Sequence, residues 1–137
     1  MADAILVDTN VLLDLVTNDP VWADWSQGQL ETLALSNSLV INPIIYSELS
    51  IAFKRIEDLE RTLADVALKL TELPREALFL AGKVYLKYRQ RRGTKGSVPP
   101  DFYIGAHAAV MRWPLLTRDV ARFRSYFPTV KLIAPAS

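Results

Sequence analysis

Four short apolar runs, separated by longer segments of helical period, constrain the fold of this chain more than any other feature. The runs have the length of buried strands and cover residues 4–7, 39–41, 115–117 and 131–133. A weaker fifth candidate covers residues 70–73. Strands that alternate with helices favour a parallel sheet with helices on both faces. The sequence therefore predicts an α/β fold: a three-layer α/β/α sandwich around a mainly parallel sheet of four to five strands.

The segments between the runs have the period of amphipathic helices. The clearest predicted helices cover residues 55–70 and 75–91, where apolar residues repeat at spacings of three and four. Further helices are expected over residues 21–36, 43–54, 101–111 and 120–127. Consecutive helices that end near residues 54, 70 and 91 leave two alternatives. Their apolar faces pack as a hairpin over the sheet, or they face a second protein chain.

Length and composition limit the class of protein. Half of the 137 residues are hydrophobic, which is enough for one well-buried core, so we expect a single domain spanning residues 1–137. No apolar stretch approaches the roughly 20 residues that span a bilayer, and the N-terminus lacks the basic flank of a signal peptide. We therefore expect a cytoplasmic protein without membrane association. The absence of cysteine excludes disulfides, zinc–thiolate sites and cysteine nucleophiles, and one histidine leaves little room for histidine-rich metal sites.

Charge is distributed very unevenly along the chain. Residues 1–72 hold 12 acids and 4 bases, whereas residues 73–137 hold 3 acids and 12 bases, giving net charges of −8 and +9. This asymmetry indicates a charged partner. The candidates for binding phosphate lie in one basic stretch and are Arg89, Arg91, Arg92 and Lys95. Tyr85 and Tyr88 nearby suit base stacking, although a solvated helix face and loop is the alternative explanation of the stretch.

Four acids lie where the apolar pattern predicts buried structure, and they are Asp8, Glu48, Asp101 and Asp119. Asp8 and Asp119 follow predicted strands directly, and the carboxyl ends of parallel strands are where ligands gather. Burying an unpaired carboxylate costs several kcal/mol, so four acids suggest a shared cation. An oxygen-only site suits Mg²⁺ or Mn²⁺ better than zinc, and such ions activate water for phosphoryl chemistry.

Two of the acids have alternative explanations as helix-terminus residues. Asp8 could cap the helix that begins near Asn10, and Asp101 could stabilise the start of its helix electrostatically. Glu48 is predicted in the middle of a helix, so it has no capping role there. We expect Asp14 to be structural or on the surface.

Two further polar residues are candidates for supporting roles. We expect His107, which lies among alanines, to be a core or interface residue rather than a base. Thr117 could orient a metal-bound water or an oxygen of Asp119, or it could reflect the β-propensity of threonine alone.

Four segments together resemble a known family, and they are residues 7–11 (VDTNV), 47–49 (SEL), 100–108 (PDFYIGAHA) and 116–119 (LTRD). They resemble the PIN-domain family, specifically the VapC-type toxins of bacterial toxin–antitoxin pairs. The resemblance implies a helix-covered parallel sheet and a Mg²⁺- or Mn²⁺-dependent endoribonuclease that acts on structured RNA, often tRNA. It also implies a homodimer and a cognate antitoxin protein in the catalytic groove.

The resemblance also implies roles for individual residues. Asp8 and Asp101 correspond to the principal metal ligands, while Glu48 and Asp119 complete the acidic site directly or through water. Thr117 matches the hydroxyl-bearing position before the last acid. The basic stretch is where differences in RNA preference are expected.

Three alternatives remain open at the level of sequence. Similar acidic sites serve nucleases that cut DNA flaps or single strands. An RNA-binding scaffold without turnover would share the charge pattern. A receiver-like signalling module also clusters acids around Mg²⁺, but it predicts a lysine after a strand where this chain has Arg118.

Overall fold

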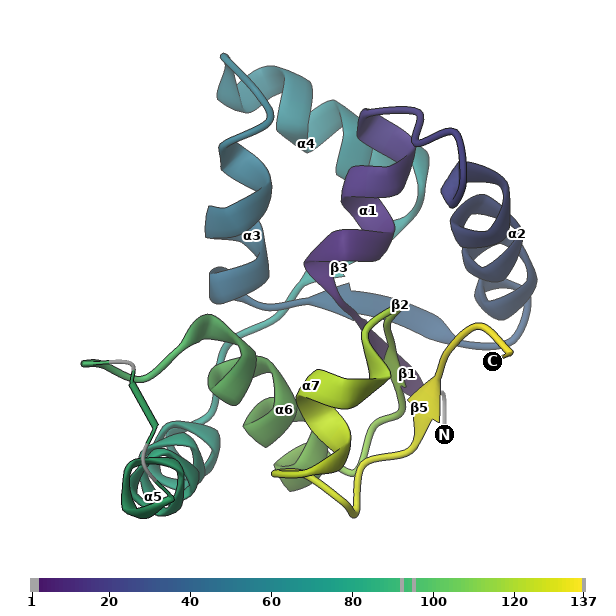
Figure 1. The fold of residues 1–137 in the computed structure, drawn as a ribbon. Coiled ribbons are helices and arrows are strands. Elements are labelled where there is room, and N and C mark those ends of the chain that lie inside the picture. Colours follow the sequence, from purple (N-terminus) through teal and green to yellow (C-terminus); the bar gives the residue numbers. More distant parts are fainter. Residues whose placement is uncertain (1–2, 92, 95, 137) are drawn as a thin grey trace.

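The computed structural model describes residues 3–91, 93–94 and 96–136. Within these residues, five parallel strands form one sheet in the order β3-β2-β1-β4-β5 (Figure 1). The strands are β1 (Ala4–Val7), β2 (Ser38–Ile41), β3 (Leu68–Leu70), β4 (Leu115–Leu116) and β5 (Leu132–Ile133). The helices are α1 (Thr9–Val16), α2 (Ala23–Ala34), α3 (Pro43–Ser50), α4 (Ile56–Asp65), α5 (Arg75–Gln90), α6 (Pro100–Met111) and α7 (Val120–Arg124). The predicted α/β architecture with a parallel sheet is confirmed.

The order of the strands reverses at the centre of the sheet. From β1 the chain moves outward through β2 and β3, then returns across the sheet to β4, on the other side of β1. Since crossovers between parallel strands are right-handed, the reversal places helices on opposite faces. Figure 1 shows α1 to α4 on one side of the strands and α5 to α7 on the other. The gap between the carboxyl ends of β1 and β4 is therefore the topological switch point, where ligands bind in sheets of this kind.

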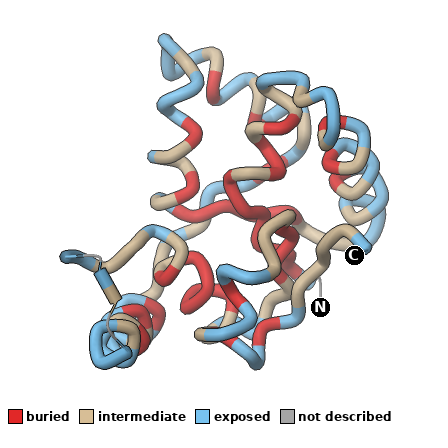
Figure 2. The backbone as a smooth tube through the Cα atoms, in the orientation of Figure 1, coloured by how far each residue is buried: buried red, intermediate tan, exposed pale blue. Residues whose placement is uncertain are grey.

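The core lies along the central strands, as the red segments of Figure 2 show. All four residues of β1 are buried, and so are both residues of β4. The outer strands are less covered, and Leu70 in β3 keeps 54% of its surface exposed. The exposure of β3 explains why it was the weakest strand candidate in the sequence.

The predicted helix over residues 55–70 was wrong in its last five residues. Helix α4 ends at Asp65, and the chain then enters β3 at Leu68, slightly earlier than the predicted strand over residues 70–73. Ala67 has φ of 56°, a left-handed conformation that a right-handed helix cannot contain. The helical spacing of Val66 and Leu70 therefore extended the predicted helix across a turn.

Three other predicted helices are longer than the observed ones. Helix α3 ends at Ser50 instead of residue 54, α7 ends at Arg124 instead of residue 127, and α2 is shorter at both ends than residues 21–36. Beyond the end of α7, the apolar side chain of Phe127 is still buried in the core. The spacing of apolar residues indicates which side chains are buried, and buried side chains continue beyond the last residue of the helix.

An aromatic cluster joins α5 and α6 to the segment that follows α7. Its ring centroids lie 5.4–6.5 Å apart, and its members are Tyr85, Tyr88, Phe102, Tyr126 and Phe127. One face of α5 thus packs inside the molecule against α6, so α5 does not form the predicted hairpin with the helices that precede it. Its outer face leaves Leu78, Phe79 and Leu86 exposed. In the described part of the chain, no helix is long and apolar enough to cross a membrane.

Candidate active site

Asp8 lies at the switch point because β1 ends one residue before it. It is 2% exposed and caps α1, accepting a hydrogen bond from the Thr9 backbone N–H at 2.7 Å. Its other oxygen accepts a hydrogen bond from the Thr117 hydroxyl at 2.8 Å. The pKa of Asp8 is raised to about 6, mainly by burial and to a smaller degree by the charge of Asp101, against the lowering effect of these two hydrogen bonds. Asp8 therefore does cap a helix, yet the cap does not offset the cost of burying its charge.

The Thr117 hydroxyl joins the two strand ends. Besides donating to Asp8, it accepts a hydrogen bond from the Asp119 backbone N–H at 3.0 Å and lies 3.5 Å from the Asn10 amide nitrogen. The sequence suggested that Thr117 orients a water or an Asp119 oxygen. In the structure it contacts the backbone of Asp119 and the carboxylate of Asp8, so it fixes the loop after β4 against the start of α1.

Glu48 reaches the same region from α3. Its carboxylate accepts a hydrogen bond from the Thr9 hydroxyl at 2.6 Å. The prediction that Glu48 sits in the middle of a helix was wrong, because α3 ends at Ser50 and places Glu48 in its last turn. A carboxylate near a helix C-terminus faces the negative end of the helix dipole. The local structure therefore disfavours an acid here, which leaves room for a compensating cation.

Asp101 and Asp119 both form ion pairs with the same arginine. Asp101 lies in the first turn of α6, and Asp119 immediately precedes α7. The guanidinium of Arg122 lies 3.1 Å from a carboxylate oxygen of Asp101 and 2.8 Å from one of Asp119. Burial raises the pKa of Asp101, and the charge of Arg122 lowers it. The negative charges of Glu48 and Asp119 raise this pKa as well. Asp101 thus couples electrostatically to the other acids.

The expectation that all four acids are buried holds only for Asp8. Glu48, Asp101 and Asp119 are half-buried, because they line the open edge of the sheet rather than its interior. In the described residues, no group of three or more His, Cys, Asp or Glu side chains is arranged to hold a metal ion as it stands. The donor chemistry nevertheless fits a hard divalent cation, since the groups coupled to Asp8 include carboxylate and hydroxyl oxygens.

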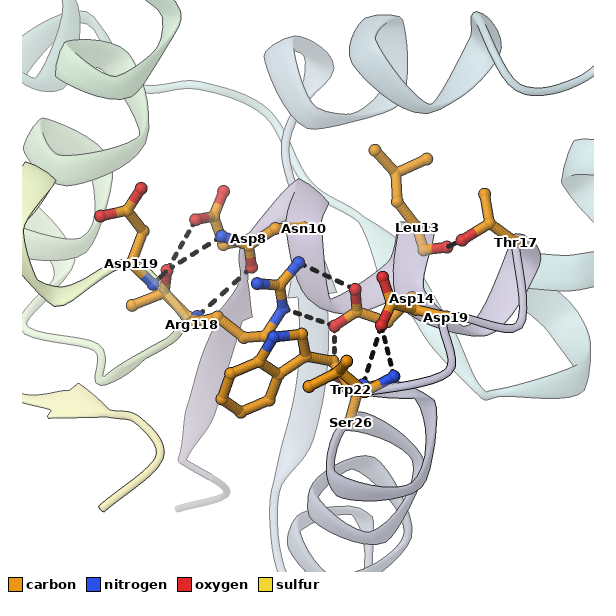
Figure 3. Close-up of polar contacts among 12 residues, drawn as sticks. Asp8, Asn10, Leu13, Asp14, Thr17, Asp19, Trp22, Ser26, Arg118 and Asp119 are labelled. Atoms are coloured by element: carbon orange, nitrogen blue, oxygen red, sulfur yellow. Dashed lines mark hydrogen bonds and ion pairs between the residues drawn. The ribbon is translucent and has the colours of Figure 1, made fainter. Parts of the chain in front are cut away.

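A second polar network, not foreseen from the sequence, lies beside the acidic site (Figure 3). The guanidinium of Arg118 binds both oxygens of Asp14, at 2.7 and 2.9 Å, and lies 5.1 Å from the centre of the Trp22 ring. The Ser26 hydroxyl also donates to Asp14, at 2.7 Å. Asp14 is therefore buried and structural, and the surface alternative for it was wrong.

This network holds the loop that carries Asp119. The backbone N–H of Arg118 donates to the Asn10 side-chain oxygen at 3.3 Å, so both ends of Arg118 are tied to α1. Asn10 and Arg118 stand inside the VDTNV and LTRD segments, next to Asp8 and Asp119 in the chain. The sequence shows that Asn10 and Arg118 lie near these acids in the chain. Which side chains they bind depends on the fold.

Arg89 and Arg91 lie at the C-terminal end of α5. Arg91 lies 5.9 Å from the centre of the Tyr126 ring, and an Arg89 nitrogen lies 3.5 Å from the Gly93 carbonyl oxygen. Tyr88 accepts a hydrogen bond from the Thr94 backbone N–H, so its ring is held inside the aromatic cluster rather than offered for base stacking. The two other basic candidates, Arg92 and Lys95, lie outside the described residues.

Comparison with known proteins identifies the fold family. The family model described as the PIN domain matches residues 5–126. Among curated proteins, none matches the sequence significantly. Solved structures match over nearly the full chain: VapBC2 from Rickettsia felis bound to a promoter DNA fragment has a TM-score of 0.75 at 22% identity, covering 97% of this chain and 99% of the matched chain.

Two further solved structures are similar to the chain. DNA-bound VapBC from Salmonella typhimurium has a TM-score of 0.69 at 21% identity, covering 98% of each chain. VapBC-1 from nontypeable Haemophilus influenzae has a TM-score of 0.70 at 19% identity, covering 96% of this chain and 97% of the matched chain. At these identities the likeness is one of fold.

Proposed function

The chain belongs to the PIN-domain family, and from this premise we propose that it is a Mg²⁺- or Mn²⁺-dependent endoribonuclease, the toxin of a toxin–antitoxin pair. Family membership supports a nuclease. The observation that carries the proposal is the buried Asp8 carboxyl at the switch point, whose pKa is raised to about 6 and which is coupled to Asp101. A carboxylate that is costly to ionise gains most from a bound cation.

The proposed metal ligands are Asp8 and Asp101, with Glu48 and Asp119 completing the site directly or through water. A divalent ion held there supplies a water that is nucleophilic near neutral pH and neutralises charge on the scissile phosphate. Thr117 and Thr9 hold the carboxylates of Asp8 and Glu48 in fixed orientations by donating hydrogen bonds to them. No nucleophilic side chain is required for this reaction.

The proposed substrate is structured RNA, with tRNA as one candidate. Arg89 and Arg91 are proposed to bind its phosphates. The net charge of +9 over residues 73–137 supports a polyanionic partner. Arg92 and Lys95 belong to the same proposed surface by sequence. We propose that residues 1–137 act as a single nuclease domain, in the cytoplasm.

The antitoxin and the homodimer are proposed from the structural neighbours and the family. Several of the similar structures are VapBC complexes, and one from Klebsiella pneumoniae is described as a toxin–antitoxin complex. Growth arrest on induction of the gene alone, and its relief by a small adjacent partner gene, is the expected result. Harmless induction would count against toxicity, and sedimentation of the purified protein measures the dimer.

The catalytic proposal is tested by replacing Asp8 and Asp101 separately with asparagine. Asp8→Asn keeps a side chain that can cap α1, so the fold is expected to survive. Each variant is expected to cleave RNA at least about 100-fold more slowly in Mn²⁺. Replacing even a residue that supports a metal ligand typically lowers activity about 10–100-fold, and these residues are proposed to be ligands themselves. Asp24→Asn, an exposed position on α2, is the matched control and is expected to cleave normally.

Circular dichroism of each variant separates lost chemistry from lost folding. Cleavage by the wild-type protein is expected to stop with chelator. Full activity in both Asp8→Asn and Asp101→Asn would refute the proposed metal ligands. Digestion of matched RNA and DNA oligonucleotides tests the substrate class, and preferential cleavage of DNA would replace the ribonuclease proposal by the DNA-nuclease alternative.

A further inference from the structure

The guanidinium of Arg122 lies among the carboxylates of the acidic site. Its Nη1 lies 3.1 Å from Oδ1 of Asp101, and its Nε lies 2.8 Å from Oδ2 of Asp119. The two carboxylates come from different elements, the first turn of α6 and the start of α7. One guanidinium therefore bridges two of the four acids.

The bridge only partly offsets the negative charge around it. Among the described residues, Arg122 is the one base whose charge acts on Asp101, where Glu48 and Asp119 both oppose ionisation. It acts on Asp8 as well, and that effect is the smallest of those acting there. A monovalent guanidinium thus faces several carboxylates, a charge balance that a divalent ion improves.

The position of Arg122 allows it to leave the carboxylates without disturbing the core. Its side chain is 49% exposed, so its guanidinium has solvent on one side. The next residue, Phe123, is fully buried, and Phe127 packs against the Phe102 ring. These aromatic side chains anchor α7 and its continuation, while the exposed arginine is free to rotate outward.

We propose that Arg122 is an internal counter-ion that competes with the divalent cation for Asp101 and Asp119. In the absence of the cation the guanidinium holds the two carboxylates together, and it releases their oxygens when the cation binds. Arg122 therefore lowers the affinity of the site for metal while stabilising the site without it. The inference rests on the proposed function, because it assumes that these carboxylates bind a divalent ion.

The test measures Mn²⁺ binding to the full-length protein by isothermal titration calorimetry, without RNA. Arg122→Gln is expected to bind Mn²⁺ about three- to tenfold more tightly than wild type, given the strength of partly exposed ion pairs and the lost charge repulsion. Arg124→Gln is the matched control. Arg124 is exposed on the same helix and makes no ion pair among the described residues, so its replacement is expected to leave the affinity unchanged.

Thermal unfolding gives a second measurement that does not depend on activity. Without metal, Arg122→Gln is expected to melt at a lower temperature than wild type, because its carboxylates repel one another. Saturating Mn²⁺ is expected to raise its Tm by more than it raises that of wild type. Arg122→Lys keeps the charge but loses the fork that reaches both acids, so an affinity between those of wild type and Arg122→Gln is expected.

The outcomes distinguish this inference from the proposed function. Equal or weaker Mn²⁺ binding by Arg122→Gln, with binding by wild type intact, would overturn the competition alone. Absence of Mn²⁺ binding in wild type and variants alike would overturn the proposed metal site and the competition together.

Discussion

The only histidine of the chain is fully buried, and its neighbours determine its protonation. The Asn42 side-chain oxygen accepts the Ile45 backbone N–H, so the Asn42 amide nitrogen is free to donate to Nδ1 of His107 at 3.2 Å. Nδ1 therefore acts as an acceptor and the neutral ring carries its proton on Nε2. Nε2 has no hydrogen-bond partner among the described residues, and Trp113 packs against the ring at 5.2 Å. His107 is a core residue, as the sequence indicated.

Burial lowers the pKa of His107 to about 4, which predicts a specific dependence on pH. The folded protein holds the ring neutral, whereas the unfolded chain titrates near 6.5. Stability is therefore complete above pH 6.5 and declines as the pH falls toward 4, by up to about 3 kcal/mol from this group. One histidine gives one assignable Hε1 signal in NMR. A signal that titrates near 6.5 in the folded protein would contradict the prediction.

Sequence reasoning at the residue scale succeeded where the cause was local. Asp8 and Asp119 each follow an apolar run, and β1 and β4 are indeed paired, so both acids lie at one edge of the sheet. Arg122 and the Arg118–Asp14 pair could not be predicted as site residues. Their partners are fixed by tertiary structure, and a local pattern of polarity carries no information about which distant side chain a guanidinium meets.

Two glycines in the middle of helices have opposite roles. A Cβ on Gly105 in α6 would lie 2.3 Å from the Phe127 ring, whereas a Cβ on Gly82 in α5 would have no heavy atom within 4 Å. Gly105 is thus required by close packing of the aromatic residue that follows α7. Gly82 faces solvent and weakens its helix without a packing reason.

Replacing each glycine with alanine is expected to change stability in opposite directions. Gly82→Ala should raise the free energy of unfolding by about 0.5–1 kcal/mol through helix propensity. Gly105→Ala should lower it by about 1–3 kcal/mol, because the Phe127 ring must shift. Urea denaturation measures both, and Gly82→Ala serves as the control for helix propensity. Stabilisation by Gly105→Ala would show that the ring moves at little cost.

Burial helped to make the central strands predictable, although β5 was also predicted and both of its residues are only partly buried. The central strands were recognised because every residue of β1 is apolar and buried. The three-residue β3 was misplaced because it has one buried residue and depends on pairing with β2 for its existence. Hydrogen bonding to a neighbouring strand leaves no trace in the local sequence when the strand is short and half-exposed.

At the scale of the whole molecule, the charge split along the chain becomes a split across the sheet. Helices α1 to α4 belong to the acidic residues 1–72 and lie on one face, whereas α5 to α7 belong to the basic residues 73–137 and lie on the other (Figure 1). The acidic site lies at the edge where the two layers meet. The basic layer can therefore attract phosphate toward the carboxylates from one side.

The basic layer is tested by the double variant Arg89→Gln/Arg91→Gln. It is expected to bind single-stranded RNA more weakly, and the slope of log affinity against log salt should shrink by about 0.7 for each lost phosphate contact. The control is Arg55→Gln/Arg61→Gln, since these arginines pair with Glu57 and Asp58 on the acidic side. Fluorescence anisotropy over a salt series measures the slope. An unchanged slope would place the RNA elsewhere.

The hydrogen bond from Thr117 to Asp8 joins residues 109 positions apart in the chain. During translation Asp8 leaves the ribosome early, but β4 and Asp119 follow only after all the other acids have emerged. A growing polypeptide shorter than 119 residues cannot assemble the four carboxylates, whatever part of it has folded. The complete set of four acids therefore exists only when synthesis of the sheet is nearly finished.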